Sequence, residues 1–461
     1  MKVIFNNNKP VDSKGLWLVY EDRLDDENFS EEIKSWCKAA NFTGKAEQFL
    51  LVPDEKCGVK GALFGMGKID EKNPYAPFVL RKLANLLPEG SWYFHSKLTA
   101  PFLQLLSLAA AGYKFDRYLE TCNKTIEIIV PEDISLEKLN LYHNITCDSR
   151  DLVNIPSYDL GPAGLEKSVR SLLAEYNGKL EVIKGEELLS KNFPLIYAVG
   201  KSGNLHEEPR LIDYIWGDEN APKVTLVGKG VCFDSGGLGI KPSGAMVGMK
   251  KDMGGAANVI ALARLIMSFN LPVRLRVLLP VVENLISHEA FRPGDIFTSR
   301  MGKTVEIGHT DAEGRLILAD ALTYADEENP EILLDMATLT GAARVATGPD
   351  LPPFFTNSDD FAKNIEGEST ALVDPMWRFP LWAPYNKNLK SPIADLNNVT
   401  TDGFAGSITA ALFLQNFVQN AKIWAHFDIY AGASSQNSDL PFGNEVQTVR
   451  AIFATLKKYF S

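Results

Sequence analysis

The second half of this chain alternates strand and helix patterns, and that alternation most constrains its fold. Helical patterns occupy 254–269, 316–328 and 408–419. Short apolar, β-branched runs that predict buried strands lie around them at 195–200, 224–228, 273–282, 332–339 and 423–429. Strands that alternate with helices form a mostly parallel sheet covered on both faces. The sequence therefore predicts an α/β/α domain whose functional residues gather at the carboxyl ends of strands.

The length of the chain predicts more than one domain, because 461 residues exceed what one hydrophobic core usually serves. Residues 1–147 mix apolar strands, such as 125–130, with a buried helix expected at 101–113, and predict a smaller N-terminal α/β domain. Residues 148–194 are polar and predict a helical linker. Residues 195–461 then form the larger C-terminal domain with the central sheet.

Composition excludes several classes of protein. The net charge of −11 argues against general binding to nucleic acid. No apolar segment reaches the ~18 residues that a membrane span requires, and the first residues lack the apolar core of a signal peptide. The five cysteines are scattered and odd in number, with no C-x-x-C pair, which is typical of reduced thiols. These features predict a cytoplasmic protein without a membrane partner.

The run from 308 to 316, GHTDAEGRL, is the densest cluster of charge in the sequence. If the run is extended, Asp311 and Glu313 point to the same face. Gly314 permits a sharp turn, and Arg315 adds a permanent cation. Two close carboxylates repel each other unless a cation neutralises them, so the run predicts either a metal site or a solvated surface loop.

Three further polar clusters follow predicted strands, and each has an ordinary structural explanation when taken alone. Residues 227–243 contain Lys229, Asp234 and Lys241 among several glycines, but no phosphate-binding loop motif. Asp252 precedes a helix and could simply be its N-cap. The fourth cluster, 335–343, contains Thr338, Thr340 and Gly341. Because all four clusters fall at strand ends and carry oxygen ligands or cations, together they favour one shared site.

The kinds of side chain indicate which metals this site would suit. The six histidines show no paired metal-binding spacing, which argues against a zinc site built from imidazoles. Three Asp and one Glu would instead suit a pair of divalent ions bridged by carboxylates. Paired ions of this kind are typical of hydrolases. Residue chemistry alone thus predicts a two-metal hydrolase and leaves its substrate open.

Taken together, these segments resemble the leucine aminopeptidase (cytosol aminopeptidase) family of dinuclear metallopeptidases. The family hallmark, N-T-D-A-E-G-R-L, corresponds here to residues 309–316. Residues 227–243 and 249–257 match its other metal and catalytic segments in order and spacing. The resemblance extends from about residue 148 to the C-terminus. It implies an enzyme that releases N-terminal amino acids, with Leu- or Met-like residues preferred, from peptide substrates.

The resemblance also implies two divalent metal ions per subunit, with manganese and zinc the leading candidates. Asp234 and Glu313 would bridge the two ions. Lys229 and Asp252 would complete the shell of one ion, and Asp311 would complete that of the other. A neutral lysine amine is an unusual ligand, which requires a lowered pKa.

The mechanism that the resemblance implies is attack on the scissile carbonyl by a metal-bridging water. Lys241 would stabilise the developing oxyanion, and Arg315 would hold a bicarbonate ion that acts as general base. The family also assembles as a homohexamer. The residues implied to bind substrate are Met249, His309, Thr338, Leu339 and Gly341.

His309 departs from the family pattern, which usually has Asn at this position. Histidine titrates near neutrality, so the substitution predicts a changed preference for the second substrate residue or a changed pH dependence. A tolerated replacement without kinetic effect is the alternative. For the whole chain, the alternatives are a Cys-Gly-type dipeptidase, a regulatory DNA-binding relative that keeps the fold, and an inactive scaffold.

Overall fold

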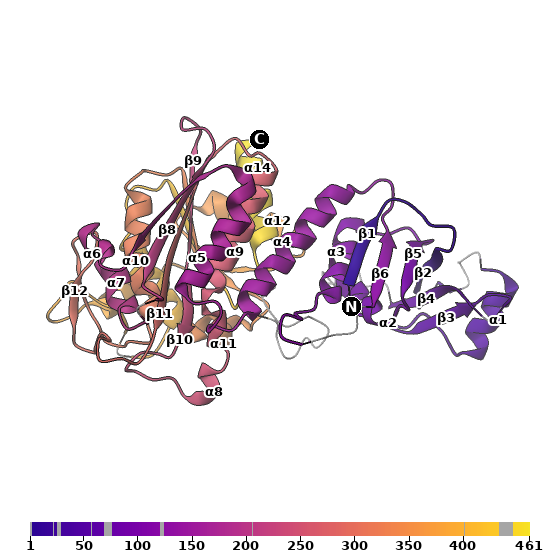
Figure 1. Cartoon of the computed structure of the whole chain (residues 1–461), viewed down its shortest axis with the longest axis horizontal. Coiled ribbons are helices and arrows are strands. Elements are labelled where there is room, and N and C mark those ends of the chain that lie inside the picture. Colours follow the sequence, from indigo (N-terminus) through magenta and orange to yellow (C-terminus); the bar gives the residue numbers. More distant parts are fainter. Residues whose placement is uncertain are drawn as a thin grey trace. The chain divides into compact units, whose positions relative to one another are not determined.

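The computed structural model describes residues 2–461 except 22, 25–28, 57, 69–75, 120–123, 205, 401 and 433–445. The chain forms two compact units that divide between Cys147 and Asp148 (Figure 1). Among the described residues, the free cysteines are Cys37, Cys147 and Cys232, whereas Cys57 and Cys122 lie outside them. None of the described helices is long and apolar enough to cross a membrane.

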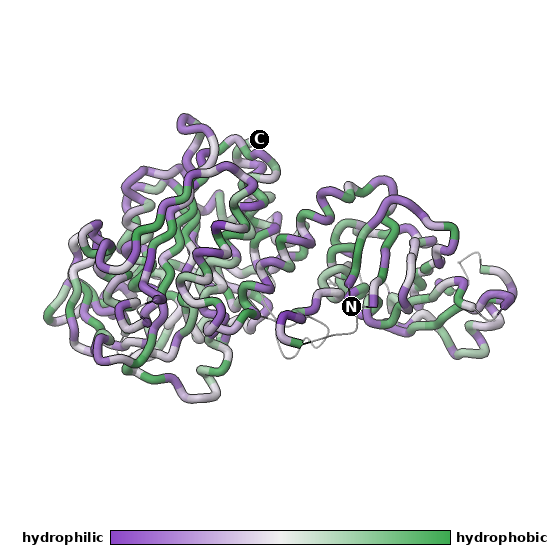
Figure 2. Tube along the Cα trace, in the orientation of Figure 1, coloured by the Kyte–Doolittle hydropathy of each residue, from purple (hydrophilic) through white to green (hydrophobic). Residues whose placement is uncertain are grey.

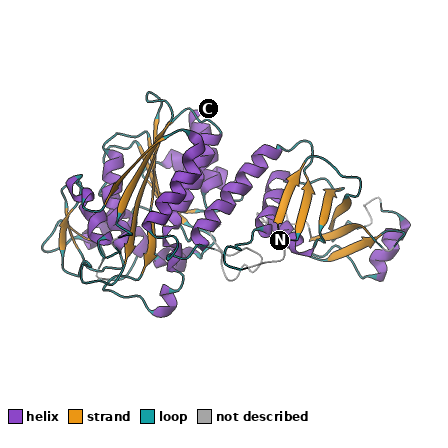
Figure 3. Ribbon diagram, in the orientation of Figure 1, coloured by secondary structure: helices purple, strands orange, loops and turns teal. Residues whose placement is uncertain are grey.

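The N-terminal unit contains one six-stranded sheet with helices packed against it (Figure 3). All neighbouring strands are parallel except β3 and β4. The predicted strand at 125–130 and the predicted helix at 101–113 are both present, as β6 and α3. The strands, in sheet order, are β1 (Lys2–Asn6), β6 (Thr125–Ile129), β5 (Gly90–Phe94), β2 (Lys14–Tyr20), β4 (Val59–Gly67) and β3 (Phe49–Pro53). The helices are α1 (Glu31–Ala39), α2 (Arg81–Leu86) and α3 (Pro101–Gly112), and α4 (Leu136–Asn154) crosses the division between the units.

The C-terminal unit is built on a nine-stranded sheet whose centre is parallel, as the sequence predicted. The strands β18, β14, β9 and β11 run parallel to one another, and the antiparallel pairs lie toward the two edges. Figure 2 shows the hydropathy of these central strands. The strands in order are β16 (Trp377–Arg378), β15 (Pro353–Thr356), β18 (Ile423–Asp428), β14 (Ile332–Ala337), β9 (Lys223–Gly228), β11 (Arg274–Asn284), β8 (Arg210–Trp216) and β7 (Lys179–Lys184), with β10 (Gly230–Asp234) paired to β11.

Helices cover both faces of this sheet, so the predicted three layers are present. In Figure 1, α9 (Gly254–Ser268) and α10 (Glu313–Asp326) lie on opposite sides of the strands. The remaining helices of this unit are α5 (Pro162–Leu173), α6 (Glu187–Ser190), α7 (Pro194–Gly200), α8 (Ser243–Met246), α11 (Gly341–Thr347), α12 (Asp359–Ala371), α13 (Gly406–Gln415) and α14 (Val449–Phe460). A small separate sheet joins β12 (Ile296–Thr298), β13 (Thr304–Glu306) and β17 (Leu396–Asn397).

One predicted strand is wrong, because residues 195–200 lie within helix α7. The helix begins at Pro194, and the buried carboxylate of Asp320 accepts hydrogen bonds from the backbone N–H groups of Leu195 at 2.7 Å and Ile196 at 3.3 Å. These contacts satisfy amides that the first turn of a helix leaves free. The segment is apolar throughout because α7 is buried against α10, so its sequence pattern could not distinguish a helix from a buried strand.

The region proposed as a linker, 148–194, contains the end of α4, helices α5 and α6, and strand β7. Strand β7 pairs with β8 in antiparallel orientation along six residue pairs, from Lys179 with Ile215 to Lys184 with Arg210. This region therefore supplies the edge strand of the large sheet.

Candidate active site

The polar clusters meet in one pocket of about 480 Å³ in the C-terminal unit. The structure brings together eleven of the twelve site residues that the sequence predicted. The exception is His309, which lies outside the pocket lining. The predicted residues that line the pocket are Lys229, Asp234, Lys241, Met249, Asp252, Asp311, Glu313, Arg315, Thr338, Leu339 and Gly341.

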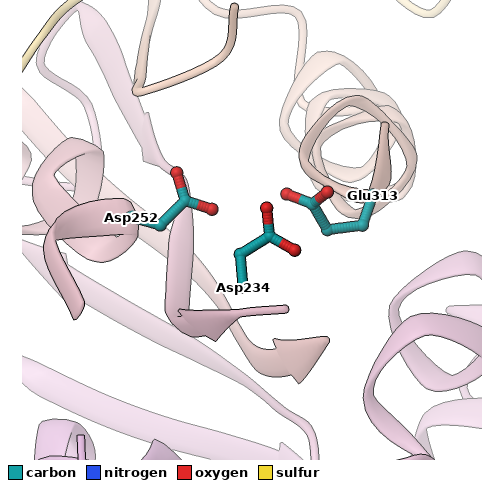
Figure 4. A group of neighbouring side chains, drawn as sticks. All are labelled: Asp234, Asp252 and Glu313. Carbon is teal, nitrogen blue, oxygen red and sulfur yellow. The ribbon is translucent and has the colours of Figure 1, made fainter. Parts of the chain in front are cut away.

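Three buried carboxylates form the centre of the site. Asp234 ends strand β10, Asp252 lies in the short helical turn Met249–Met253 before α9, and Glu313 is the first residue of α10. One oxygen from each lies within 4.8 Å of the others, and Figure 4 shows Asp234 between the other two. Each residue is at most 4% exposed. Such close negative charges require a cation between them.

Lys229 supplies one such cation. Its Nζ lies 2.8 Å from Asp252 Oδ2 and 2.9 Å from Glu313 Oε1, and it donates a hydrogen bond of 3.0 Å to the carbonyl of Thr338. Burial lowers the pKa of Lys229, but the carboxylates of Asp252, Glu313 and Asp234 outweigh burial and raise that pKa above its ordinary value. In the absence of a metal, Lys229 is therefore an ammonium that neutralises the carboxylates.

Glycine 314 makes room for this lysine. A Cβ atom at position 314 would lie 2.5 Å from Lys229 Cε and 2.7 Å from its Nζ. The residue is part of helix α10, so the sharp turn expected at Gly314 is wrong. Its lack of a side chain serves the close approach of Lys229.

The run that holds Asp311 and Glu313 is not extended, so the condition under which both carboxylates point to one face is not met. Asp311 lies in a turn and Glu313 begins a helix, so the two carboxylates approach each other through a loop-to-helix transition. The position of Glu313 in the first turn suits a negative charge, because the positive end of the helix dipole lies there.

Lys241 provides a second cation opposite Asp234 and Asp311. Its Nζ lies 2.8 Å from Asp234 Oδ2 and also contacts Asp311 Oδ1. Burial lowers the pKa of Lys241. The charge of Asp234, together with the hydrogen bonds that Lys241 donates to Asp234 and Asp311, outweighs burial and raises that pKa overall. The two lysines thus share the neutralisation of four carboxylates.

Crowding keeps two of these carboxylic acids partly protonated. Burial and the charge of Asp234 raise the pKa of Glu313 to about 8 and that of Asp311 to about 6. Oε2 of Glu313 is buried and has no hydrogen-bond partner among the described residues. An unpartnered carboxylate oxygen within an oxygen-rich group is suited to a divalent cation, so the residues fit the metal that the sequence predicted.

Arg315 lines the pocket as a buried guanidinium. Burial lowers its pKa to about 10, and its NH1 donates a hydrogen bond of 2.6 Å to the carbonyl of Asn398. Its Nε is buried without a partner among the described residues. Arg315 thus remains a cation at neutral pH with hydrogen-bonding capacity to spare.

The structure explains how His309 can stand where Asn is usual. The backbone N–H of Asp311 donates a hydrogen bond of 3.0 Å to His309 Nδ1. An Asn side chain commonly accepts the same bond from the residue two positions on. His309 therefore supports the loop that carries Asp311, with Nδ1 unprotonated.

Several residues of the site were not singled out from the sequence. Nδ2 of the fully buried Asn284 donates to Asp234 Oδ1 at 2.8 Å and to the carbonyl of Thr310 at 3.0 Å. Asn398 accepts from the N–H of Gly308 at 2.8 Å and donates to the carbonyl of His309 at 2.8 Å, which fixes the acidic loop. Asn284 ends β11, so the strand-end rule could have found it. Asn398 follows a two-residue strand and offered no such signal.

Thr338, expected in the substrate pocket, also orients a carboxylate. Its hydroxyl donates to Asp252 Oδ1 at 2.7 Å. Met249 lines the pocket, and no atom lies within 4 Å of a Cβ built on Gly341, so this side of the pocket is open.

The fold and this carboxylate–lysine pocket define a metal-binding hydrolase site, and comparisons with known proteins agree. The catalytic domain of the cytosol aminopeptidase family (M17) matches residues 148–453, and the N-terminal domain of M17 aminopeptidases matches residues 15–131. A protein named "Probable cytosol aminopeptidase" from Chlamydia trachomatis serovar D is 35% identical over 454 residues, which are 92% of this chain and 90% of that protein.

Solved structures show the same relationship. The crystal structure of a cytosol aminopeptidase from Coxiella burnetii has a TM-score of 0.93 and 39% identity, and the match covers 99% of both chains. The bottromycin maturation enzyme BotP in complex with Mn has a TM-score of 0.86 and 29% identity, covering 98% of this chain and 100% of that one.

The chain belongs to the cytosol aminopeptidase family. It is accordingly an aminopeptidase, a hydrolase of a metal-dependent family.

Metal binding should strengthen as the pH rises from 6 to 8. Glu313, whose pKa is raised to about 8, holds a proton through most of this window, and Lys229 holds one as an ammonium, so an ion that takes both as ligands must displace both protons. Asp311, whose pKa is raised to about 6, holds a proton only at the lower end of the window. Each proton released contributes about tenfold in affinity per pH unit. Titration calorimetry with Mn²⁺ in buffers of different ionisation enthalpy would measure both the affinity and the protons released.

Glu313→Gln should reduce this pH dependence, whereas Asp360→Asn, on the exposed surface of α12, should not. An affinity of the unaltered chain that is constant between pH 6 and 8 would contradict the assignment.

Proposed function

We propose that the chain releases N-terminal Leu- or Met-like residues from peptides with two divalent ions, manganese or zinc, held by Lys229, Asp234, Asp252, Asp311 and Glu313. The observation that carries the proposal is the group of three buried carboxylates with two lysines at the wall of one pocket. When bound, the ions would lower the pKa of a water and polarise the scissile carbonyl.

The binding of substrate follows from the charges at this wall. The α-amino group of a peptide, as a neutral amine, is a metal ligand, so it would bind the ion that Lys229 and Asp252 hold. The apolar side chain of Met249 and the open space above Gly341 then favour an apolar first residue. Thr338 and Leu339 complete this part of the pocket.

Lys241 is proposed to stabilise the negative charge that develops on the scissile carbonyl oxygen. Its ammonium is at the pocket wall, it is held by Asp234 and Asp311, and its pKa is raised, so it remains charged at neutral pH. A fixed cation aimed at developing charge is the arrangement that lowers such a barrier.

Arg315 is proposed to hold a bicarbonate ion that serves as general base. The support is a buried guanidinium at the pocket wall with an unpartnered Nε. A planar guanidinium matches the geometry of a carboxylate-like anion.

Lys241→Ala should lower kcat for Leu- and Met-amidomethylcoumarin by about 10²–10³, the usual effect of removing one donor to an oxyanion. Metal content, measured by elemental analysis, should remain that of the unaltered enzyme. Lys390→Ala, which removes an exposed lysine, is the matched control. Retention of full activity by Lys241→Ala would contradict its role.

His309→Asn should preserve turnover of a small amide substrate, because Asn can accept the same hydrogen bond from the Asp311 N–H. The imidazole of His309 would also contact the second substrate residue, and its replacement would change that contact. We expect a changed ranking across a panel of Leu-X dipeptides, measured as kcat/KM. An unchanged ranking would assign His309 to loop support alone. Cys-Gly belongs in this panel, since its strong selection over Leu-X would favour the narrower dipeptidase.

We propose a cytoplasmic homohexamer. The proposal follows from the family to which the chain belongs. Single large apolar side chains are exposed on the C-terminal unit, including Val247 at 83%, Phe404 at 77% and Val345 at 86%, and contacts between subunits would cover such side chains. Sedimentation equilibrium should give six times the mass of one chain, whereas a monomer at micromolar concentration would contradict the assembly.

A further inference from the structure

Arg344 is a cation of the pocket wall that the proposed mechanism leaves without a role. It lies on α11, three residues after Gly341, which places the two on neighbouring positions of the helix surface. Its side chain is exposed, and its guanidinium carbon lies 5.6 Å from the centroid of the Tyr430 ring. No described carboxylate pairs with it.

The neighbours of Arg344 leave its charge available. Lys251 Nζ lies 4.4 Å from the centroid of the same Tyr430 ring and donates a hydrogen bond of 2.8 Å to the Tyr430 carbonyl. Lys251 therefore holds Tyr430 in place. Burial lowers the pKa of Lys251 to about 8, so the permanent positive charge that an entering carboxylate would meet here is the guanidinium of Arg344.

The one lining carboxylate outside the acidic group, Asp428, forms no ion pair with Arg344. Asp428 accepts hydrogen bonds from the N–H of Leu339 at 3.0 Å, from the N–H of Thr340 at 3.1 Å and from the hydroxyl of Thr340 at 2.6 Å. The hydroxyl of Ser407 donates a further bond of 3.2 Å. Both oxygens of Asp428 are thus occupied by the segment before α11 and by Ser407.

The pocket that Arg344 lines also offers apolar surface for the methylene groups of a long side chain. Pro349, Pro352 and Pro353 line the pocket, together with Met249. A glutamate side chain would place its methylenes against these apolar groups and its carboxylate at the guanidinium. A planar guanidinium can bind both oxygens of a carboxylate.

We propose that Arg344 is a specificity-determining residue that binds the side-chain carboxylate of substrates with an N-terminal glutamate. This inference rests on the proposed aminopeptidase function. It adds N-terminal glutamate to the Leu- and Met-like first residues that the enzyme would accept. The reason is that one pocket provides both apolar surface and a cation that pairs with no described carboxylate.

The test compares glutamyl- and glutaminyl-amidomethylcoumarin, which differ in charge but hardly in shape, with the leucyl compound as reference. For the metal-loaded enzyme, kcat/KM should favour glutamyl over glutaminyl at low ionic strength. Arg344→Ala should lower this ratio roughly three- to tenfold, the range expected for a partly exposed ion pair to a guanidinium. Arg344→Lys should retain part of the preference. Arg344→Glu should invert it, and Lys363→Ala, an exposed lysine on α12, should leave it unchanged.

The salt dependence provides a second readout. Rising ionic strength should reduce the glutamyl-to-glutaminyl ratio of the unaltered enzyme but not that of Arg344→Ala.

Three outcomes separate this inference from the proposed function. If leucyl substrate is cleaved but Arg344→Ala leaves the glutamyl-to-glutaminyl ratio unchanged, the role of Arg344 is refuted while the aminopeptidase remains. If Arg344→Ala instead weakens all dipeptides with a free carboxyl terminus equally, relative to their amides, Arg344 binds that terminus and the assignment to the first side chain is overturned. Failure of the metal-loaded enzyme to cleave any aminoacyl substrate would refute the proposed function itself.

Discussion

The ion pairs of Lys229 with Asp252 and Glu313 are the interactions on which this site depends. Three carboxylates within 4.8 Å of one another would otherwise repel strongly in a buried environment. The lysine comes from the segment after β9, Asp252 from the turn before α9 and Glu313 from the start of α10. A single ammonium thus joins three segments that are remote in sequence, and it holds them where a divalent ion would be bound.

The parallel sheet explains why these segments meet. The ends of β9, β10 and β14 lie at one edge because these strands run in the same direction, and the turns that follow them converge there. This much followed from the alternation of strands and helices, which is why the sequence predicted that the polar clusters share one site. The individual pocket residues, such as Met249 and Leu339, followed from the resemblance to the family. The sequence failed at 195–200, where a helix buried among other elements is as uniformly apolar as a buried strand.

Other parts of the site depend on contacts that no local pattern records. Asn398 fixes the loop of Asp311 from a position remote in sequence, and Asn284 positions Asp234 from the neighbouring strand. Nδ1 of His309 accepts the hydrogen bond from the Asp311 N–H that an Asn side chain would accept. This replacement can be recognised only when the conformation of the turn is known. Arg344 likewise belongs to no motif. That none of the described carboxylates pairs with it becomes visible only in the folded pocket.

The close approach of Gly314 to Lys229 ties together two positions far apart along the chain. Helix α10 lies against the stem of the lysine, so a methyl group at 314 and a lysine at 229 cannot occupy the same space. Neither position can therefore drift independently during evolution. The glycine in the Ala-Glu-Gly-Arg run thus leaves the space that a side chain from the link between β9 and β10 fills. A sequence that changed one of the pair would have to change the other.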